Sequence, residues 1–383
     1  MADKKDRVLI LLSALGTAGF FLLPLVEAKP NRIVSGEKLL ALEYLGVLGA
    51  LIIMGWAMLM ALSLYGTKRK NEYISIAAII TAVGLVVLLP IGGGSIQEIG
   101  ANPRISFSSG LYIQVLFLYI ILSTYLPRVG WKRRLKLLLG VGALLVMASL
   151  MYMGYFERLS IIKEYGVRQR QFYNNLYIHG VLAFGSVLAG ALIAIPLGYL
   201  AYIKKRLEGR IMVPLSIIET IPSLSLFGIL LVPLSGLGQL PFFRAIGVSG
   251  IGWAPAFVAL TLYTLLPIGR NTLTGFHSID KNVVQAAKGM GMSRRQILRK
   301  IEIPLAFPVI FTGIRIAFIQ TIGGAVLAGL VGGGGMGSFV FLGLAEASPD
   351  LILLGVIPIV FFTVVLDYSL KVFERYVRRV VYD

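Results

Sequence analysis

Two charged side chains lie deep inside apolar stretches of the sequence, where a charge needs a chemical explanation. Of the 383 residues, 14% are charged and 57% are hydrophobic. Glu219 and Arg315 each lie roughly 12–15 Å from the end of an apolar run, taking 1.5 Å per helical residue. Because a lone charge inside a membrane is costly, we expect the two to form an ion pair within one subunit or across a dimer. The alternative is that each side chain reaches the membrane surface independently.

The rest of the composition excludes most covalent and metal chemistry. The chain has no cysteine and two histidines, which excludes disulfides, thiolate metal sites, cysteine catalysis and histidine metal clusters. We therefore expect no catalytic residue, no metal and no cofactor. His179, near the end of an apolar run, is expected to pack or to hydrogen-bond rather than to catalyse.

The formal net charge of +18 at pH 7 is high for so apolar a chain. In a soluble protein such an excess would indicate nucleic-acid binding. Here the basic residues form short clusters between apolar runs, a pattern typical of the cytoplasmic loops of membrane proteins. We expect the chain to lie in a lipid membrane and to have no nucleic acid as a partner.

The stretch 284–304 is polar, basic and helix-prone, and it lies between two apolar runs. Ala286 and Ala287 are small enough to let a short helix enter a groove of a partner protein. Two glycines then end that helix, and Ser293 can cap a second helix over residues 294–301. A proline ends the loop where the next apolar run begins. The alternative is an ordinary basic loop at anionic lipid headgroups. The candidate docking residues are Gln285, Ala286, Ala287, Gly289, Gly291, Arg294, Ile301 and Pro304.

A membrane-spanning helix needs about 20 mostly apolar residues, and about ten stretches of the chain qualify. They lie near 8–26, 40–66, 73–91, 110–126, 137–155, 176–203, 211–232, 254–270, 305–331 and 350–370. The first follows a basic N-terminus and is longer than the apolar region of a typical signal peptide, so we expect an uncleaved signal-anchor helix. The expected fold class is an all-α polytopic membrane protein with about ten transmembrane helices.

The distribution of Lys and Arg predicts the orientation of these spans. With ten spans, most basic residues lie on one side when both termini are cytoplasmic. The segment 157–175 places basic residues outside, and we interpret it as an external amphipathic linker. Residues 1–156 before it form accessory spans. After it, prolines and glycines interrupt the apolar runs, which is tolerated only where protein or a water-filled cavity surrounds the backbone. The second half is therefore expected to be the working domain.

The stretch 285–304 resembles the loop signature of ABC-importer permeases, E-A-A-x-x-x-G followed nine residues later by I-x-L-P. Both spacings match, whereas Gln285 replaces the acidic residue and Ile303 replaces leucine. The overall texture is similar to the osmoprotectant branch, which imports glycine betaine, choline and related quaternary amines, in a longer subgroup with extra N-terminal spans. The likeness covers roughly residues 170–375 and includes Ile195-Pro196-Leu197-Gly198, Glu219-Thr220-Ile221-Pro222-Ser223 and Gly332-Gly333-Gly334-Gly335-Met336-Gly337.

This resemblance implies that the last five spans form a type I ABC-importer permease core. The core would occupy residues 176–371, with a cytoplasmic coupling loop at 271–304 and a cytoplasmic tail at 372–383. The glycine-rich segment 332–337 lacks the Gly-Lys-Ser/Thr ending of a phosphate-binding loop, so we expect a close-packed external connection there. The candidate residues for the pathway or the intramembrane pair are Glu219, Thr220, Pro222, Ser223, Arg315 and Gln320.

The resemblance also implies partners in the cell inner membrane: two copies of a cytoplasmic ABC ATPase, a periplasmic solute-binding protein and a second permease subunit, identical or homologous. No Walker A motif occurs in the sequence, so we expect a separate ATPase and no enzymatic activity in this chain. Two alternatives remain. One is a permease for another solute, such as methionine or an organic anion. The other is an ion-coupled secondary transporter, although the two halves show no convincing repeat.

Overall fold

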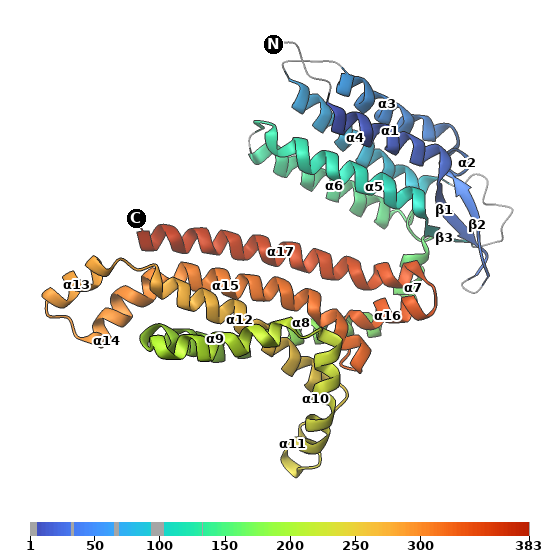
Figure 1. Ribbon diagram of the computed structural model, residues 1–383. Coiled ribbons are helices and arrows are strands. Elements are labelled where there is room, and N and C mark those ends of the chain that lie inside the picture. The colour runs from blue at the N-terminus through green and yellow to red at the C-terminus, as the bar shows by residue number, and fades with distance from the viewer. Residues whose placement is uncertain (1–5, 32–33, 65–68, 93–102, 132, 383) are drawn as a thin grey trace. The chain divides into compact units, whose positions relative to one another are not determined.

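The computed structural model describes residues 6–31, 34–64, 69–92, 103–131 and 133–382. Helices dominate it (Figure 1), and the chain divides into two compact units, Met1–Val167 and Arg168–Asp383. The boundary falls inside the stretch 157–175. This stretch is not one continuous helix, because α7 (Ser160–Val167) ends the first unit and α8 (Gln169–Ile203) begins the second.

The first unit combines helices with a small antiparallel sheet of order β2-β1-β3. The predicted mostly helical fold is confirmed, but the sequence did not indicate this small sheet. Its strands are β1 (Pro24–Lys29), β2 (Glu37–Leu40) and β3 (Arg104–Phe107). Its other helices are α1 (Arg7–Leu22), α2 (Ala41–Leu45), α3 (Gly49–Leu64), α4 (Lys70–Ile91), α5 (Ser109–Tyr125) and α6 (Arg133–Tyr152), with 3-10 turns at Gly46–Leu48 and Leu126–Arg128.

The first strand begins where α1 is forced to end. Leu23 precedes a proline and has an extended backbone, with φ −112° and ψ 139°. A residue before proline disfavours helical geometry, and proline itself cannot donate to a helix. The chain continues as β1, which pairs Val26 with Leu39 of β2 and with Phe107 of β3. The apolar run near 8–26 is thus a helix followed by a strand.

One buried glutamine joins three helices of the first unit. The Trp56 indole Nε1 of α3 donates to the Gln114 Oε1 atom of α5 at 2.5 Å. The Gln114 Nε2 atom donates to the carbonyl oxygen of Gly16 in α1 at 2.7 Å. Trp56 and Gln114 are both fully buried, so each polar group depends on the other for a partner.

We expect Gln114→Leu to lower the stability of the first unit by about 1–3 kcal/mol, because the buried Trp56 N–H would lose its acceptor. The midpoint of thermal unfolding of the purified protein in detergent would measure this loss. Ser123→Ala is the matched control, since Ser123 lies on the same helix and its hydroxyl is exposed. Equal shifts for the two variants would contradict the assigned role of Gln114.

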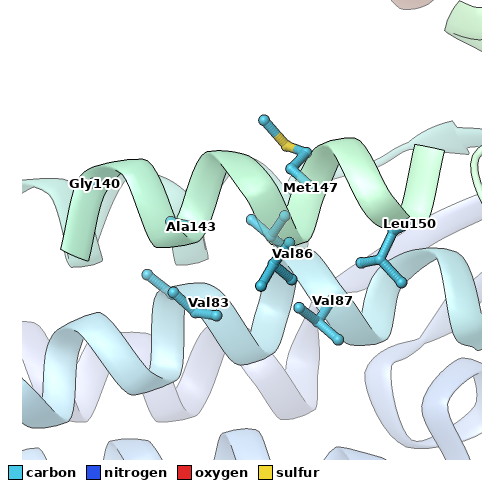
Figure 2. A pocket seen from close by; sticks show the side chains of 9 residues that line it. Val83, Val86, Val87, Gly140, Ala143, Met147 and Leu150 are labelled. Atoms are coloured by element: carbon cyan, nitrogen blue, oxygen red, sulfur yellow. The ribbon is translucent and has the colours of Figure 1, made fainter. Parts of the chain in front are cut away.

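An apolar cavity of about 270 Å³ lies between α4 and α6 in the first unit (Figure 2). Aliphatic and small side chains from both helices surround it: Ala82, Val83, Val86, Val87, Gly140, Ala143, Val146, Met147 and Leu150. It offers no hydrogen-bonding side chain, so it is not suited to hold a polar solute.

The second unit is built on the long helices α8, α12 (Trp253–His277), α15 (Ile303–Gly324) and α17 (Pro349–Tyr382), as Figure 1 shows. Between them lie α9 (Lys205–Thr220), α10 (Ser223–Leu237), α11 (Pro241–Ala245), α13 (Lys281–Gly289), α14 (Arg294–Ile297), a π-helical turn (Leu298–Glu302), a 3-10 segment (Ala325–Val331) and α16 (Gly337–Ala345).

Glycines let α8 pack closely against α12. A Cβ atom added to Gly190 would lie 1.7 Å from the Thr264 Oγ1 atom. A Cβ atom added to Gly198 would lie 2.6 Å from the Gly269 carbonyl oxygen. Both contacts are far inside van der Waals separation, so only glycine allows this approach. Gly198 belongs to the Ile195–Gly198 motif, which this contact explains.

The expected count of ten spans is not confirmed. Among the described residues, six helical stretches are long and apolar enough to cross a membrane: Ala41–Leu64, Lys70–Ile91, Ser109–Arg128, Gln169–Ile203, Arg294–Val331 and Pro349–Val377. Arg7–Leu22 and Leu139–Tyr152 are shorter apolar helices. The expected span 211–232 is wrong as a single helix, because the chain bends by 106° between α9 and α10. In Figure 1, α10 and α11 point away from the long helices.

Candidate functional site

The loop between α12 and α15 begins with a capped helix. Asp280 precedes α13, and its carboxylate accepts a hydrogen bond from the Asn282 N–H at 2.8 Å. This helix ends at Gly289, and Gly291 adopts a positive φ of 77°, which favours glycine. The prediction that the glycines end the first helix is confirmed.

The second half of the loop starts at a capping box. The Gln296 N–H donates to the Ser293 hydroxyl oxygen, and the Ser293 N–H donates to the Gln296 side chain at 2.8 Å. This confirms Ser293 as a helix cap. The expected helix 294–301 is only partly right, because α14 passes through the π-helical turn directly into α15. Pro304 does not interrupt the helix, since proline is accepted in the first turn of a helix.

The two alanines of the loop face different surroundings. Ala287 is 1% exposed and packs inside its own chain. Gln285, Ala286 and Gly289 are exposed. The expectation that both alanines face a partner is therefore corrected to Ala286 alone. Ile301 and Pro304 are half-buried, so they contribute to packing on this side of the loop.

An apolar cluster fixes the loop to the ends of the long helices. Phe276 and Ile279, at the end of α12, and Ala306 and Ile310 of α15 form its buried centre. Partly buried side chains from the loop, α8 and α15 complete it: Ile195, Tyr199, Tyr202, Val284, Leu298, Leu305 and Ile314. In Figure 1, α13 and α14 form one end of the second unit. The loop therefore packs directly against α8, α12 and α15.

An ion pair connects the two ends of the loop's second helical segment. The Arg294 Nη1 atom lies 2.5 Å from the Glu302 Oε1 atom. The Glu302 side chain is 1% exposed, whereas that of Arg294 is 51% exposed. Glu302 was not among the residues selected from the sequence, because nothing in its local pattern predicts that it is buried.

Arg315 lies in a charged cluster between α15 and α17. Its Nε atom donates to the Asp367 Oδ1 atom at 2.8 Å, and its Nη1 atom donates to the Glu374 Oε2 atom at 3.4 Å. The Lys371 Nζ atom lies 2.6 Å from Asp367, and the Thr312 hydroxyl donates to Glu374 at 3.0 Å. The half-buried charge of Arg315 in an apolar helix thus has acidic partners that offset the cost of its burial.

This cluster corrects the pairing expected from the sequence. Among the described residues, Arg315 pairs with Asp367 and Glu374 and forms no ion pair with Glu219, which is exposed at the end of α9. Pairing of Glu219 across a dimer stays a prediction. The signal that could have found the acidic partners is the helical spacing of Asp367, Lys371 and Glu374 on one face of α17.

We expect Arg315→Gln to lower the free energy of unfolding by about 1.5–3 kcal/mol, because two carboxylates would lose a charged donor. Arg315→Lys should recover part of this loss, since it restores the charge but not the two-pronged geometry. The control is Arg375→Gln, since Arg375 is exposed on α17, and its effect should stay below about 0.5 kcal/mol. Thermal unfolding in detergent is the measurement, and equal losses in Arg315→Gln and Arg375→Gln would contradict the cluster's role.

The bend between α9 and α10 has its own hydrogen bonds. The Tyr263 hydroxyl of α12 donates to the Ile221 carbonyl oxygen at 2.6 Å. The Thr220 hydroxyl donates to the Ile217 carbonyl oxygen at 2.7 Å. Pro222 precedes α10, and Ser223 is its first residue. The bend therefore leaves these backbone groups satisfied.

Four of the six candidate pathway residues are exposed on the single chain. These are Glu219, Thr220, Pro222 and Gln320, whereas Ser223 and Arg315 are half-buried. Glu219, Thr220, Pro222 and Ser223 lie together at the bend, and Gln320 lies on α15. The structure thus brings the bend residues together. Among the described residues, no hydrogen bond or ion pair joins them to the Arg315 cluster.

The glycine-rich segment lies at the other end of the second unit. The Gly252 N–H donates to the Val331 carbonyl oxygen at 2.7 Å. Gly332, Gly334 and Gly335 have positive φ values. A Cβ atom added to Gly335 would lie 3.3 Å from the Nδ1 atom of His179, which is 2% exposed. These contacts make the segment a close-packed connection.

The family comparison identifies the second unit. Residues 168–380, more than half of the chain, match the family described as the inner membrane component of binding-protein-dependent transport systems. The chain belongs to this family. Residues 4–162 match the N-terminal domain of the ABC transporter permease YehY. The two matched regions coincide with the two compact units.

Individual relatives are similar to about half of this chain. It is 40% identical over 199 residues to the choline transport system permease protein OpuBB of Bacillus subtilis, covering 52% of this chain and 85% of that protein. It is 38% identical over 179 residues to the osmoprotectant import permease protein OsmW of Salmonella typhimurium, covering 47% and 79%. A solved structure of the MetNI methionine ABC transporter aligns with 24% identity and a TM-score of 0.47, covering 55% of this chain and 97% of that one.

Proposed function

We propose that this permease is the membrane-embedded subunit of an ATP-driven importer for osmoprotectants of the quaternary-amine class, such as glycine betaine or choline. The observation that carries the transport mechanism is the capped loop between α12 and α15, which exposes Gln285 and Ala286 while anchoring Ala287 inward. The solute class is supported by the relatives named for choline transport and osmoprotectant import.

The loop is proposed to dock on a cytoplasmic ABC ATPase. The chain contains no Walker A motif, so ATP hydrolysis is assigned to a separate subunit. Two ATPase copies need two docking loops, which implies a second permease subunit, identical or homologous. Both termini are assigned to the cytoplasm because that orientation places most Lys and Arg inside. The loop and the glycine-rich segment lie at opposite ends of the second unit (Figure 1), as this orientation requires.

A periplasmic solute-binding protein is proposed to dock at the external end, over residues 233–252 and 332–347. The bend residues Glu219, Thr220 and Pro222, together with Gln320, are exposed on the single chain and would line a pathway between two permease subunits. ATP-driven closure of the ATPases would draw the two loops together and open this pathway outward. Hydrolysis would reset it. The first unit is assigned an accessory role.

Co-purification of the tagged permease from its native membranes tests this proposal. We expect an ABC ATPase and a second permease copy or homologue to accompany it, identified by mass spectrometry. Solute binding by the partner binding protein then decides between quaternary amines and another solute, such as methionine or an organic anion. Isolation of the permease without any ATPase in mild detergent would contradict the proposed assembly.

A further inference from the structure

Glu302 is an unusual residue for a polar loop, because its carboxylate is almost completely buried. Its side chain is 1% exposed, and one oxygen accepts a 2.5 Å hydrogen bond from Arg294. The second oxygen, Oε2, is buried and has no hydrogen-bond partner among the described residues. A buried carboxylate with only one of its oxygens hydrogen-bonded lowers the stability of a fold. Stability alone therefore does not explain it.

The backbone between the two partners departs from regular helix. Residues Leu298–Glu302 form a π-helical turn between α14 and α15. In an ideal α-helix, residues eight positions apart lie about 12 Å apart along the axis and about 80° apart around it. The wider turn and the long arginine side chain bridge that separation. Single π-helical turns inside α-helices occur frequently at functional sites.

Aromatic rings from two other helices pack beside this ion pair. Tyr199 and Tyr202 of α8 lie 4.9 Å and 5.3 Å, between ring centroids, from Phe276 of α12. Both tyrosines and Leu298 of the π-helical turn pack against the same buried cluster, which contains Phe276. The ion pair thus lies where α14, α8 and α12 meet, directly before α15 begins.

We propose that Glu302 is a positioning residue that holds Arg294, and with it α14, rigidly to the start of α15. This inference rests on the proposed function. The ion pair spans the π-helical turn, so a displacement of the loop by the ATPase is passed to α15. Without the pair, the turn would absorb the displacement, and ATP hydrolysis would continue without matching solute movement.

Uptake and ATP hydrolysis by the complete complex, reconstituted in liposomes with its binding protein, test this inference. Arg294→Gln leaves the buried carboxylate without its charged partner, and we expect about fivefold less solute moved per ATP. Glu302→Gln should have a smaller effect, because the amide oxygen of glutamine can still accept a hydrogen bond from Arg294. The double variant should resemble Arg294→Gln, because the ion pair is absent from both. Arg299→Gln, an exposed position on the same turn, is the control and should keep the normal ratio.

The outcomes separate this inference from the proposed function. A fall of uptake and hydrolysis in parallel, with the ratio unchanged in Arg294→Gln, would overturn the positioning role, and so would an unchanged ratio at full activity. Glu302→Gln removes the buried charge at nearly constant side-chain size, so this variant is expected to fold even where Arg294→Gln does not, and it should still lower the ratio measurably. If the unaltered permease binds no ATPase, the proposed function fails, whatever the variants do.

Discussion

Gly198→Leu is expected to prevent the second unit from folding, which is the largest effect that we predict for a single substitution. A Cβ atom at this position would lie 2.6 Å from the Gly269 carbonyl oxygen and 2.7 Å from the Thr272 Cβ atom. Backbone cannot move aside as a flexible side chain can, so α8 and α12 must separate. Overpacking a tight core costs about 1–3 kcal/mol or more. We expect this cost to be at the upper end, because α15 packs on both helices.

The yield of monodisperse protein after extraction in mild detergent measures this effect. Gly180→Leu is the matched control, since Gly180 lies on the same helix and a Cβ atom there would meet nothing within 4 Å. We expect Gly180→Leu to give normal yield and Gly198→Leu to give almost none. Normal yield and normal thermal stability of Gly198→Leu would show that the close contact of α8 with α12 is wrong.

Ala286→Trp is expected to remove the ATPase from the complex without unfolding the permease. Ala286 is exposed on α13, whereas the neighbouring Ala287 is buried in its own chain. A large ring at position 286 therefore leaves the permease core untouched but obstructs entry of α13 into a groove of a partner. We expect at least a tenfold loss of affinity, which corresponds to about 1.4 kcal/mol.

Quantitative co-purification of the ATPase with each permease variant gives this measurement. Ala286→Ser serves as the size control at the same position, since serine adds only one oxygen atom and should retain the ATPase. The thermal unfolding of the permease alone should be the same for both variants. Retention of the ATPase by Ala286→Trp would mean that α13 docks by another face, or not at all.

Local signals in the sequence predicted the loop well. Ser293 and Gln296 form a capping box, and Gly291 has the positive φ that its position after a helix demands. Each of these features depends only on residues within one or two helical turns. The end of α1 also depends on a local residue, Pro24, but the apolar run near 8–26 was predicted to be one helix, and that prediction was wrong.

Features that depend on distant parts of the chain were missed. The partners of Arg315 come from α17, more than 50 residues later. No pattern in the residues around Arg315 therefore indicates them. The bend at Pro222 lies inside an apolar run, and composition does not distinguish a straight span from one bent by 106°. The inward position of Ala287 depends on contacts with other helices. The π-helical turn before α15 has no local sequence signal.

Uptake of radiolabelled glycine betaine and choline into proteoliposomes tests the central claim most directly. The liposomes would contain the permease with its co-purified ATPase, and the binding protein would be added outside. We predict uptake that requires ATP inside the liposomes, requires the binding protein, and continues when the ion gradients are collapsed. Uptake that persists without ATP but stops when the ion gradients are collapsed would contradict an ATP-driven permease.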